Sequence, residues 1–233
     1  MEYLFVGALI LVAILSILAT IFIKNKLAIT ILTNVIAGGL LIWKIVEFSY
    51  YIYSGSKIYP VEFSHLSYFI VGFIVLSQIK KLYFTGSVFA LISGMGYMFG
   101  ALINPLNMIN SNSLNVIIMG FVSHSLLFFL GLLLLFKFGR YNLRDIYIPI
   151  VFFILVIIYE ILVINGVFWP DLENKDSYFL VLLVEGRILE YIGVDPSNKA
   201  LNYSVTALLY LTYLGMVFLM NYLNKVSYKK SKV

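Results

Sequence analysis

Long apolar runs alternate with short polar segments along the whole chain. The pattern predicts seven membrane-spanning helices, at about residues 3–23, 27–51, 61–79, 82–103, 114–138, 146–168 and 201–223. A helix that crosses ~30 Å of hydrocarbon needs about 20 apolar residues. The runs are continuous rather than alternating, which argues against a transmembrane β-barrel. We therefore predict an all-α membrane protein, in which residues 1–233 form one polytopic domain built as a bundle of seven transmembrane helices.

Two runs have features of their own. The run at 82–103 is rich in small residues, which let helix backbones approach closely in lipid, and it is predicted to be a central, tightly packed helix. The longest predicted loop, 169–199, has an apolar middle that is interrupted by Glu185, Arg187 and Glu190. Each charge at the centre of a span costs about 2.5–3.5 kcal/mol on insertion scales. We therefore expect an outer loop with an interfacial or re-entrant helix that lies against the bundle.

Composition and charge support the same class. The chain is 62% hydrophobic and 12% charged, whereas a soluble domain carries about 25% charged residues. Lysine and arginine gather on one set of loops and on the tail, at Lys24, Lys26, Lys80, Lys81, Lys137, Arg140, Arg144, Lys225, Lys229, Lys230 and Lys232. The positive-inside rule then predicts an outside N-terminus and a cytoplasmic C-terminus in the cell membrane. The net charge of +5 comes with no dense basic domain apart from that tail, so membrane lipids rather than nucleic acids are the expected partners.

Titratable side chains within the predicted spans fall almost entirely in the outer half of the bundle. They are Lys44, Glu47, Glu62, His65, His124 and Glu160. His124, for example, lies about ten residues into its span, or ~15 Å by helical rise. Ionisable groups inside a membrane are costly and usually face the bundle interior or a wet cavity. The pattern indicates a cavity that opens to the outer leaflet, although Lys44 and Glu47, which share a helix face, could simply neutralise each other.

Few residues could carry nucleophilic chemistry, because the chain has no cysteine and only two histidines. A serine needs a nearby base, and histidine is the usual base near neutral pH. Ser64 with His124, oriented by Glu62 or Glu160, would form a Ser–His–acid arrangement. His65 could not serve Ser64 directly, since adjacent helical residues point in different directions. A metal site on both histidines with one glutamate is an alternative that lacks a metal-binding spacing, and no cofactor is predicted.

Four short motifs resemble the YwaF family of bacterial integral membrane proteins. They are PVEFSHLS at 60–67, NPL at 104–106, FVSH at 121–124 and LEYIG at 189–193. That family is related to a vertebrate transmembrane acyltransferase that acts on ether phospholipids. The resemblance implies that the family's nucleophilic cysteine falls on Ser64 and its histidine on His124. The chain departs from the family in having serine at the first of these positions and glutamate at Glu62, where relatives commonly have histidine.

Three functions remain open at this point. The first is an integral membrane acyltransferase or hydrolase that acts on a lipid or lipid-linked substrate from an outer-leaflet cavity. Its catalytic residues would be Ser64, His124, Glu62 and Glu160, and its substrate-binding residues Lys44, Glu47, His65 and Asn104. The second is a transporter for a small solute or coupled to protons. The third is a lipid-binding membrane protein without catalysis.

Overall fold

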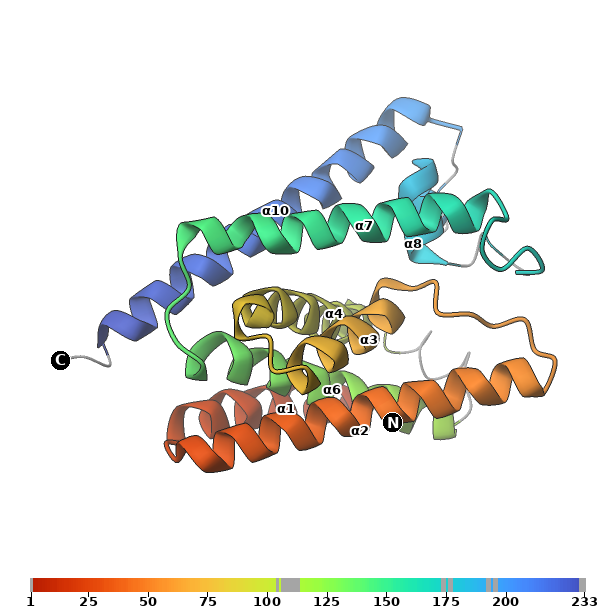
Figure 1. Cartoon of the computed structure of the whole chain (residues 1–233). Coiled ribbons are helices and arrows are strands. Elements are labelled where there is room, and N and C mark those ends of the chain that lie inside the picture. Colours follow the sequence, from red (N-terminus) through yellow and green to blue (C-terminus); the bar gives the residue numbers. More distant parts are fainter. Residues whose placement is uncertain are drawn as a thin grey trace.

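The computed structural model describes residues 2–103, 105, 114–172, 175, 178–191, 194 and 197–230, and all regular structure in these ranges is helical (Figure 1). The longer helices are α1 (Glu2–Phe22), α2 (Lys26–Tyr53), α3 (Phe63–Leu76), α4 (Tyr83–Ile103), α6 (Leu114–Lys137), α7 (Tyr147–Ile164) and α10 (Lys199–Lys230). The short helices are η1 (Lys80–Leu82), η2 (Leu143–Ile146), α8 (Phe179–Glu185) and α9 (Ile188–Tyr191).

Six segments in the described part of the chain are helical, long and apolar enough to cross a membrane. They contain α1, α2, α4, α6, α7 and α10, which supports the prediction of a multi-pass membrane protein. The remaining long apolar helix, α3, has 14 residues and so spans only about 21 Å. It is shorter than the predicted range 61–79 because Glu62 has an extended backbone and Gln78 has a φ of 53°. Both conformations are incompatible with helix continuation.

Successive helices run back and forth between two ends of the bundle. Figure 1 shows the turn between α1 and α2, the connection between α6 and α7 and the C-terminus at one end, and the segment between α2 and α3 with α8 at the other. The connections at the first end carry basic residues such as Lys24, Arg140 and Arg144. We call this first end the basic end.

Helices α4 and α6 form the tightly packed centre of the molecule, as the small residues of 82–103 predict. More of α4 is buried than of any other candidate span in the described chain. A Cβ atom added at Gly94 would lie 2.7 Å from Cβ of Phe128 and 2.8 Å from its backbone. A Cβ atom added at Gly131 would lie 2.7 Å from Cγ of Leu91. Glycines on both helices therefore allow the two backbones to touch.

Helix α10 is attached to the bundle by a buried asparagine at the basic end. The Nδ2 group of Asn224 donates to the carbonyl oxygens of Leu135 (2.6 Å) and Gly139 (2.9 Å). Its Oδ1 atom accepts a hydrogen bond from the N–H of Tyr141 at 2.9 Å. These bonds satisfy carbonyls at the end of α6, which have no partner within the helix. One side chain thus closes α6 and fixes α10 beside it.

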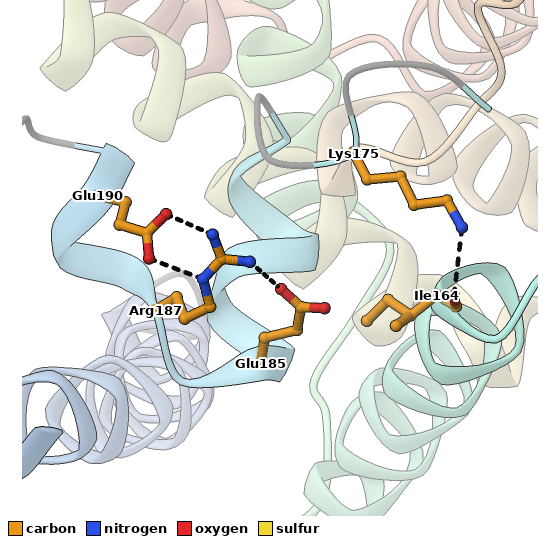
Figure 2. A network of polar contacts seen from close by, with 5 residues as sticks. All are labelled: Ile164, Lys175, Glu185, Arg187 and Glu190. Atoms are coloured by element: carbon orange, nitrogen blue, oxygen red, sulfur yellow. Dashed lines mark hydrogen bonds and ion pairs between the residues drawn. The ribbon is translucent and has the colours of Figure 1, made fainter. Parts of the chain in front are cut away.

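The described part of the long loop includes two short helices, α8 and α9. Leu180, Val181 and Leu182 of α8 are almost fully buried, so α8 packs into the bundle. Gly186 ends α8 with a left-handed backbone, φ 70°, and lies so close to the Tyr203 ring that a Cβ would be 2.7 Å from it. Figure 2 shows Arg187 between the two helices, paired with Glu190 through two hydrogen bonds (2.7 and 2.6 Å) and with Glu185 through one (2.9 Å).

Candidate functional site

The candidate site includes an ion pair within α2 whose lysine is buried. The Nζ atom of Lys44 lies 2.5 Å from Oε2 of Glu47, one turn along the same helix, as their spacing predicts. The ammonium group also lies 4.9 Å from the centre of the Tyr68 ring on α3, a cation–π distance. The side chain of Lys44 is 10% exposed. A positive charge is therefore held inside the bundle by a carboxylate on one side and an aromatic face on the other.

His124 of α6 lies between two tyrosines. Its imidazole is stacked on the ring of Tyr97 from α4, with centroids 4.3 Å apart and planes within 6°, and it meets Tyr68 edge-on at 5.7 Å. The backbone of Ser93 on α4 lies near the ring. Nδ1 of His124 is buried and has no hydrogen-bond partner among the described residues. In a neutral ring that carries its proton on Nε2, the Nδ1 lone pair is free to accept a proton or a hydrogen bond.

His65 of α3 approaches the same interior. Its ring lies edge-on to Phe48 of α2 at 5.1 Å, and its Nδ1 atom is likewise buried, with no hydrogen-bond partner among the residues that the structure describes. The charge of Lys44 acts electrostatically on both His65 and His124, and the two imidazoles act on each other. The structure thus brings Lys44, Glu47, His65 and His124 into one neighbourhood. We call these four residues together with Tyr68 and Tyr97 the histidine cluster.

Tyr68 is the centre of this cluster and was not singled out by sequence. Its hydroxyl donates a 3.0 Å hydrogen bond to Oγ of Ser123, which neighbours His124 and in turn donates weakly to the carbonyl of Gly120 (3.3 Å). The tyrosines of this chain are expected mainly at lipid interfaces, whereas Tyr68 is 1% exposed. The sequence signal that could have identified Tyr68 is its spacing. It lies four residues after Ser64 and three after His65, which places it beside each of them on the helix surface.

Ser64 lies in the first turn of α3 and is partly buried. It is four residues before Tyr68, so both side chains lie on one face of α3, separated by about 6 Å along the helix axis. Within the described part of the chain, no hydrogen bond joins Ser64 to His124. Asn104, the remaining candidate for substrate binding, lies outside the described residues.

Glu62 does not pair with His65 but is bound to the start of α8. Its Oε1 atom accepts a 2.9 Å hydrogen bond from the N–H of Phe179, the first residue of that helix. Burial raises the pKa of Glu62 to about 7, and hydrogen bonds from the backbone of Phe179, Leu180 and Phe63 act in the opposite direction. A carboxylate at a helix start satisfies N–H groups that have no partner within the helix. Glu62 thus holds the first residue of α8 beside the start of α3.

Glu160 of α7 lies near Glu62, and the charges of the two carboxylates act on each other. It is fully buried, and neither of its carboxylate oxygens has a hydrogen-bond partner among the described residues. A buried carboxylate without a partner is costly as a charge. Together, Glu62 and Glu160 form an acidic pair between α3, α7 and α8.

An aromatic group at the end opposite the basic end holds these elements together. Tyr59 is stacked on Trp169 at 4.4 Å and donates a 2.8 Å hydrogen bond to Asp171. Trp169 donates to the Tyr159 hydroxyl at 2.8 Å, and that hydroxyl donates to the carbonyl of Pro60 at 3.3 Å. In Figure 2, Lys175 donates to the carbonyl of Ile164 at the end of α7 (3.2 Å). These contacts join the segment before α3 to α7 and to the chain that follows it.

The cluster could perform proton transfer with His124 and hold an anionic or ester oxygen beside Lys44. Within the described residues, no three His, Asp or Glu side chains converge on a common point, so the two imidazoles have no such third group for a metal ion. No protein-family model matches the chain, and comparisons with curated proteins and with solved structures gave no match either.

Proposed function

We propose that the protein is an integral membrane acyltransferase or hydrolase that acts on lipid esters, with His124 as general base and Ser64 as nucleophile. The observation that carries the proposal is the Nδ1 atom of His124, which is buried, has no hydrogen-bond partner among the described residues and belongs to a ring stacked on Tyr97. An unsatisfied buried polar atom costs about 1–3 kcal/mol. Such an atom in a well-packed interior calls for an explanation, and a role in proton transfer supplies one.

The proposed reaction has two steps. Nδ1 of His124 takes the proton from Oγ of Ser64 as Oγ attacks the carbonyl carbon of a lipid ester. The bond between that carbon and the ester oxygen breaks, and the alcohol leaves with the proton from His124, so an acyl-serine forms. A second hydroxyl, from a lipid or from water, then attacks the acyl-serine by the reverse proton path. Lys44 would stabilise the negative charge on the carbonyl oxygen.

Two observations support this choice of nucleophile and base. Ser64 lies one turn before Tyr68 on α3, and Tyr68 meets the imidazole of His124 edge-on at 5.7 Å. The motifs PVEFSHLS and FVSH, which carry the resemblance to the YwaF family, contain the same two residues. We propose a distant relationship to that family on this basis.

The packing beyond the cluster favours an enzyme over a transporter. Leu127, Leu130 and Leu134 continue α6 toward the basic end, and Phe84 and Val88 of α4 lie on the same core. All five side chains are fully buried. A transport path for protons or solutes needs polar groups or water through both halves of a bundle, and these five side chains place apolar surface between the cluster and the basic end.

We further propose that α3 completes a seven-span arrangement, with the basic end on the cytoplasmic side. The positive-inside rule supports this orientation, because the segments at the basic end carry most lysines and arginines. The histidine cluster and the acidic pair would then be reached from the outer leaflet, which contains lipid esters.

A serine-reactive probe tests the proposal. The purified protein in detergent or nanodiscs is treated with a fluorophosphonate, and labelling is followed by gel and peptide mass spectrometry. We expect one label on Ser64 that is lost in Ser64→Ala. His124→Phe keeps an aromatic ring beside Tyr97 but removes the base, and we expect its labelling to be at least about 100-fold slower. Ser67→Ala is the matched control, since the Ser67 hydroxyl is bonded to the Phe63 carbonyl on the same helix.

The outcomes separate catalysis from lipid binding without catalysis. Labelling of His124→Phe at the rate of the unsubstituted protein would refute His124 as base. A folded protein that shows no label, while retaining bound lipid after purification, would favour lipid binding without catalysis. Folding of each variant is checked by size-exclusion chromatography and thermal unfolding.

A further inference from the structure

A groove at the basic end lies between α1, α6 and α10, away from the histidine cluster. Its volume is about 400 Å³, which falls within the range of ligand sites. Apolar side chains form much of its wall, namely Ile17, Ile21, Leu132 and Phe136. A groove of this kind accepts a hydrocarbon chain.

The groove has a polar, positively charged margin. Lys137, the last residue of α6, lines it together with Ser227 of α10. The hydroxyl of Thr20 also lies on the lining, but it is already bonded to the Ser16 carbonyl. Lys24, just beyond α1, acts electrostatically on Lys137. Among the described residues, no acidic side chain forms an ion pair with either lysine.

We propose that this groove binds one anionic phospholipid, with its phosphate beside Lys137 and Lys24 and an acyl chain along the apolar wall. Two lysines that repel each other, and that have no acidic partner in the described part of the chain, are stabilised by an anion beside them. Leu132 lies five residues before Lys137, about 7.5 Å deeper along α6. The charged margin and the apolar wall of the groove therefore lie along α6 in the same order as the headgroup and the acyl chain of a lipid.

The chemistry of the groove discriminates among candidate ligands. A soluble phosphate would satisfy the lysines but leave the apolar wall exposed. A zwitterionic lipid would bring a further positive charge next to Lys137 and Lys24, which would repel it. An anionic lipid satisfies both parts, and each lysine near a membrane surface strengthens its binding by about fivefold.

The test is a lipid titration of the delipidated full-length protein in detergent, with the melting temperature as readout. Phosphatidylglycerol, phosphatidylcholine and soluble glycerol 3-phosphate are compared. We expect saturable stabilisation by phosphatidylglycerol alone, and an apparent Kd about fivefold weaker in Lys137→Gln. Lys80→Gln removes a charge at the same end outside the groove and should titrate like the unsubstituted protein.

A second variant fills the groove without removing charge. Ile21 is 59% exposed, so Ile21→Trp adds bulk to the groove without crowding the core, and it should abolish the saturable effect. Equal stabilisation by phosphatidylcholine, or equal weakening in Lys80→Gln, would show a general surface effect and overturn the proposal. Stabilisation by glycerol 3-phosphate alone would overturn it in favour of a soluble anion.

Discussion

The ring of Tyr97 lies flat against the imidazole of His124, with centroids 4.3 Å apart and an angle of 6° between the planes. The two residues come from α4 and α6, the helices whose backbones touch at Gly94. The stack therefore joins the two most buried of the candidate spans in the described chain. The orientation of the His124 ring is set by this close helix contact.

Removing this stack should lower the free energy of unfolding only slightly. In Tyr97→Leu, we expect the free energy of unfolding to fall by about 1 kcal/mol, the usual contribution of an aromatic pair beyond its buried area. Tyr97→Phe keeps the ring and should stay within about 0.5 kcal/mol. Chemical denaturation in detergent measures both. A larger loss in Tyr97→Phe than in Tyr97→Leu would show that the hydroxyl, not the stack, is important.

The pair Lys44–Glu47 should behave as a unit. Lys44→Met leaves the Glu47 carboxylate without its partner, and we expect destabilisation of about 1–3 kcal/mol. Lys44→Met combined with Glu47→Leu removes both charges and should recover most of that loss. Unfolding of the single and double variants gives the coupling energy. Additive losses would mean that the pair contributes nothing as a pair.

The contact between α4 and α6 should tolerate no side chain at Gly94. In Gly94→Ala the new Cβ meets the backbone of Phe128 at 2.8 Å, so the helices must separate. We expect a loss of about 1–3 kcal/mol. Gly96→Ala and Gly100→Ala are controls on the same helix, since a Cβ at either position meets nothing within 4 Å. These controls should be neutral or slightly stabilising, and thermal unfolding distinguishes the outcomes.

Stability should depend on pH through Glu62. Burial raises its pKa from 4.5 to about 7, so the folded protein binds more protons than the unfolded chain between these values. The free energy of unfolding therefore falls as pH rises through this window, and the contribution is fully present below it. Glu62→Gln keeps an oxygen that can accept from Phe179 and should flatten this part of the profile. Melting temperatures between pH 4 and pH 8 provide the check, and an unchanged slope in Glu62→Gln would contradict it.

The long helices follow from the sequence because hydropathy and length decide them. The predicted spans 3–23 and 27–51 correspond to α1 (Glu2–Phe22) and α2 (Lys26–Tyr53). Asn25 was an additional signal for the start of α2, since its side chain accepts hydrogen bonds from Leu27 and Ala28. The shorter extent of α3 was harder to predict, because the end at Gln78 depends on a single residue with positive φ.

Only part of the site could be predicted, for a physical reason. Lys44 and Glu47 meet within one helix, so their spacing reveals the pair. The partners of Glu62 and His124 come from other elements, and no periodicity within α3 or α6 specifies them. Tyr68 and Tyr97 were missed because tyrosine suits a membrane interface as well as an interior. Which of these places it takes depends on the neighbouring helices.

The bond between Glu62 and Phe179 has a consequence for biogenesis. The two residues are 117 positions apart, so the bond can form only after most of the chain has left the ribosome. The helices α1 to α6 include the contact between α4 and α6 and can associate before that moment. The contact between the start of α3 and α8 therefore waits for the C-terminal third of the polypeptide, and partly synthesised chains lack it.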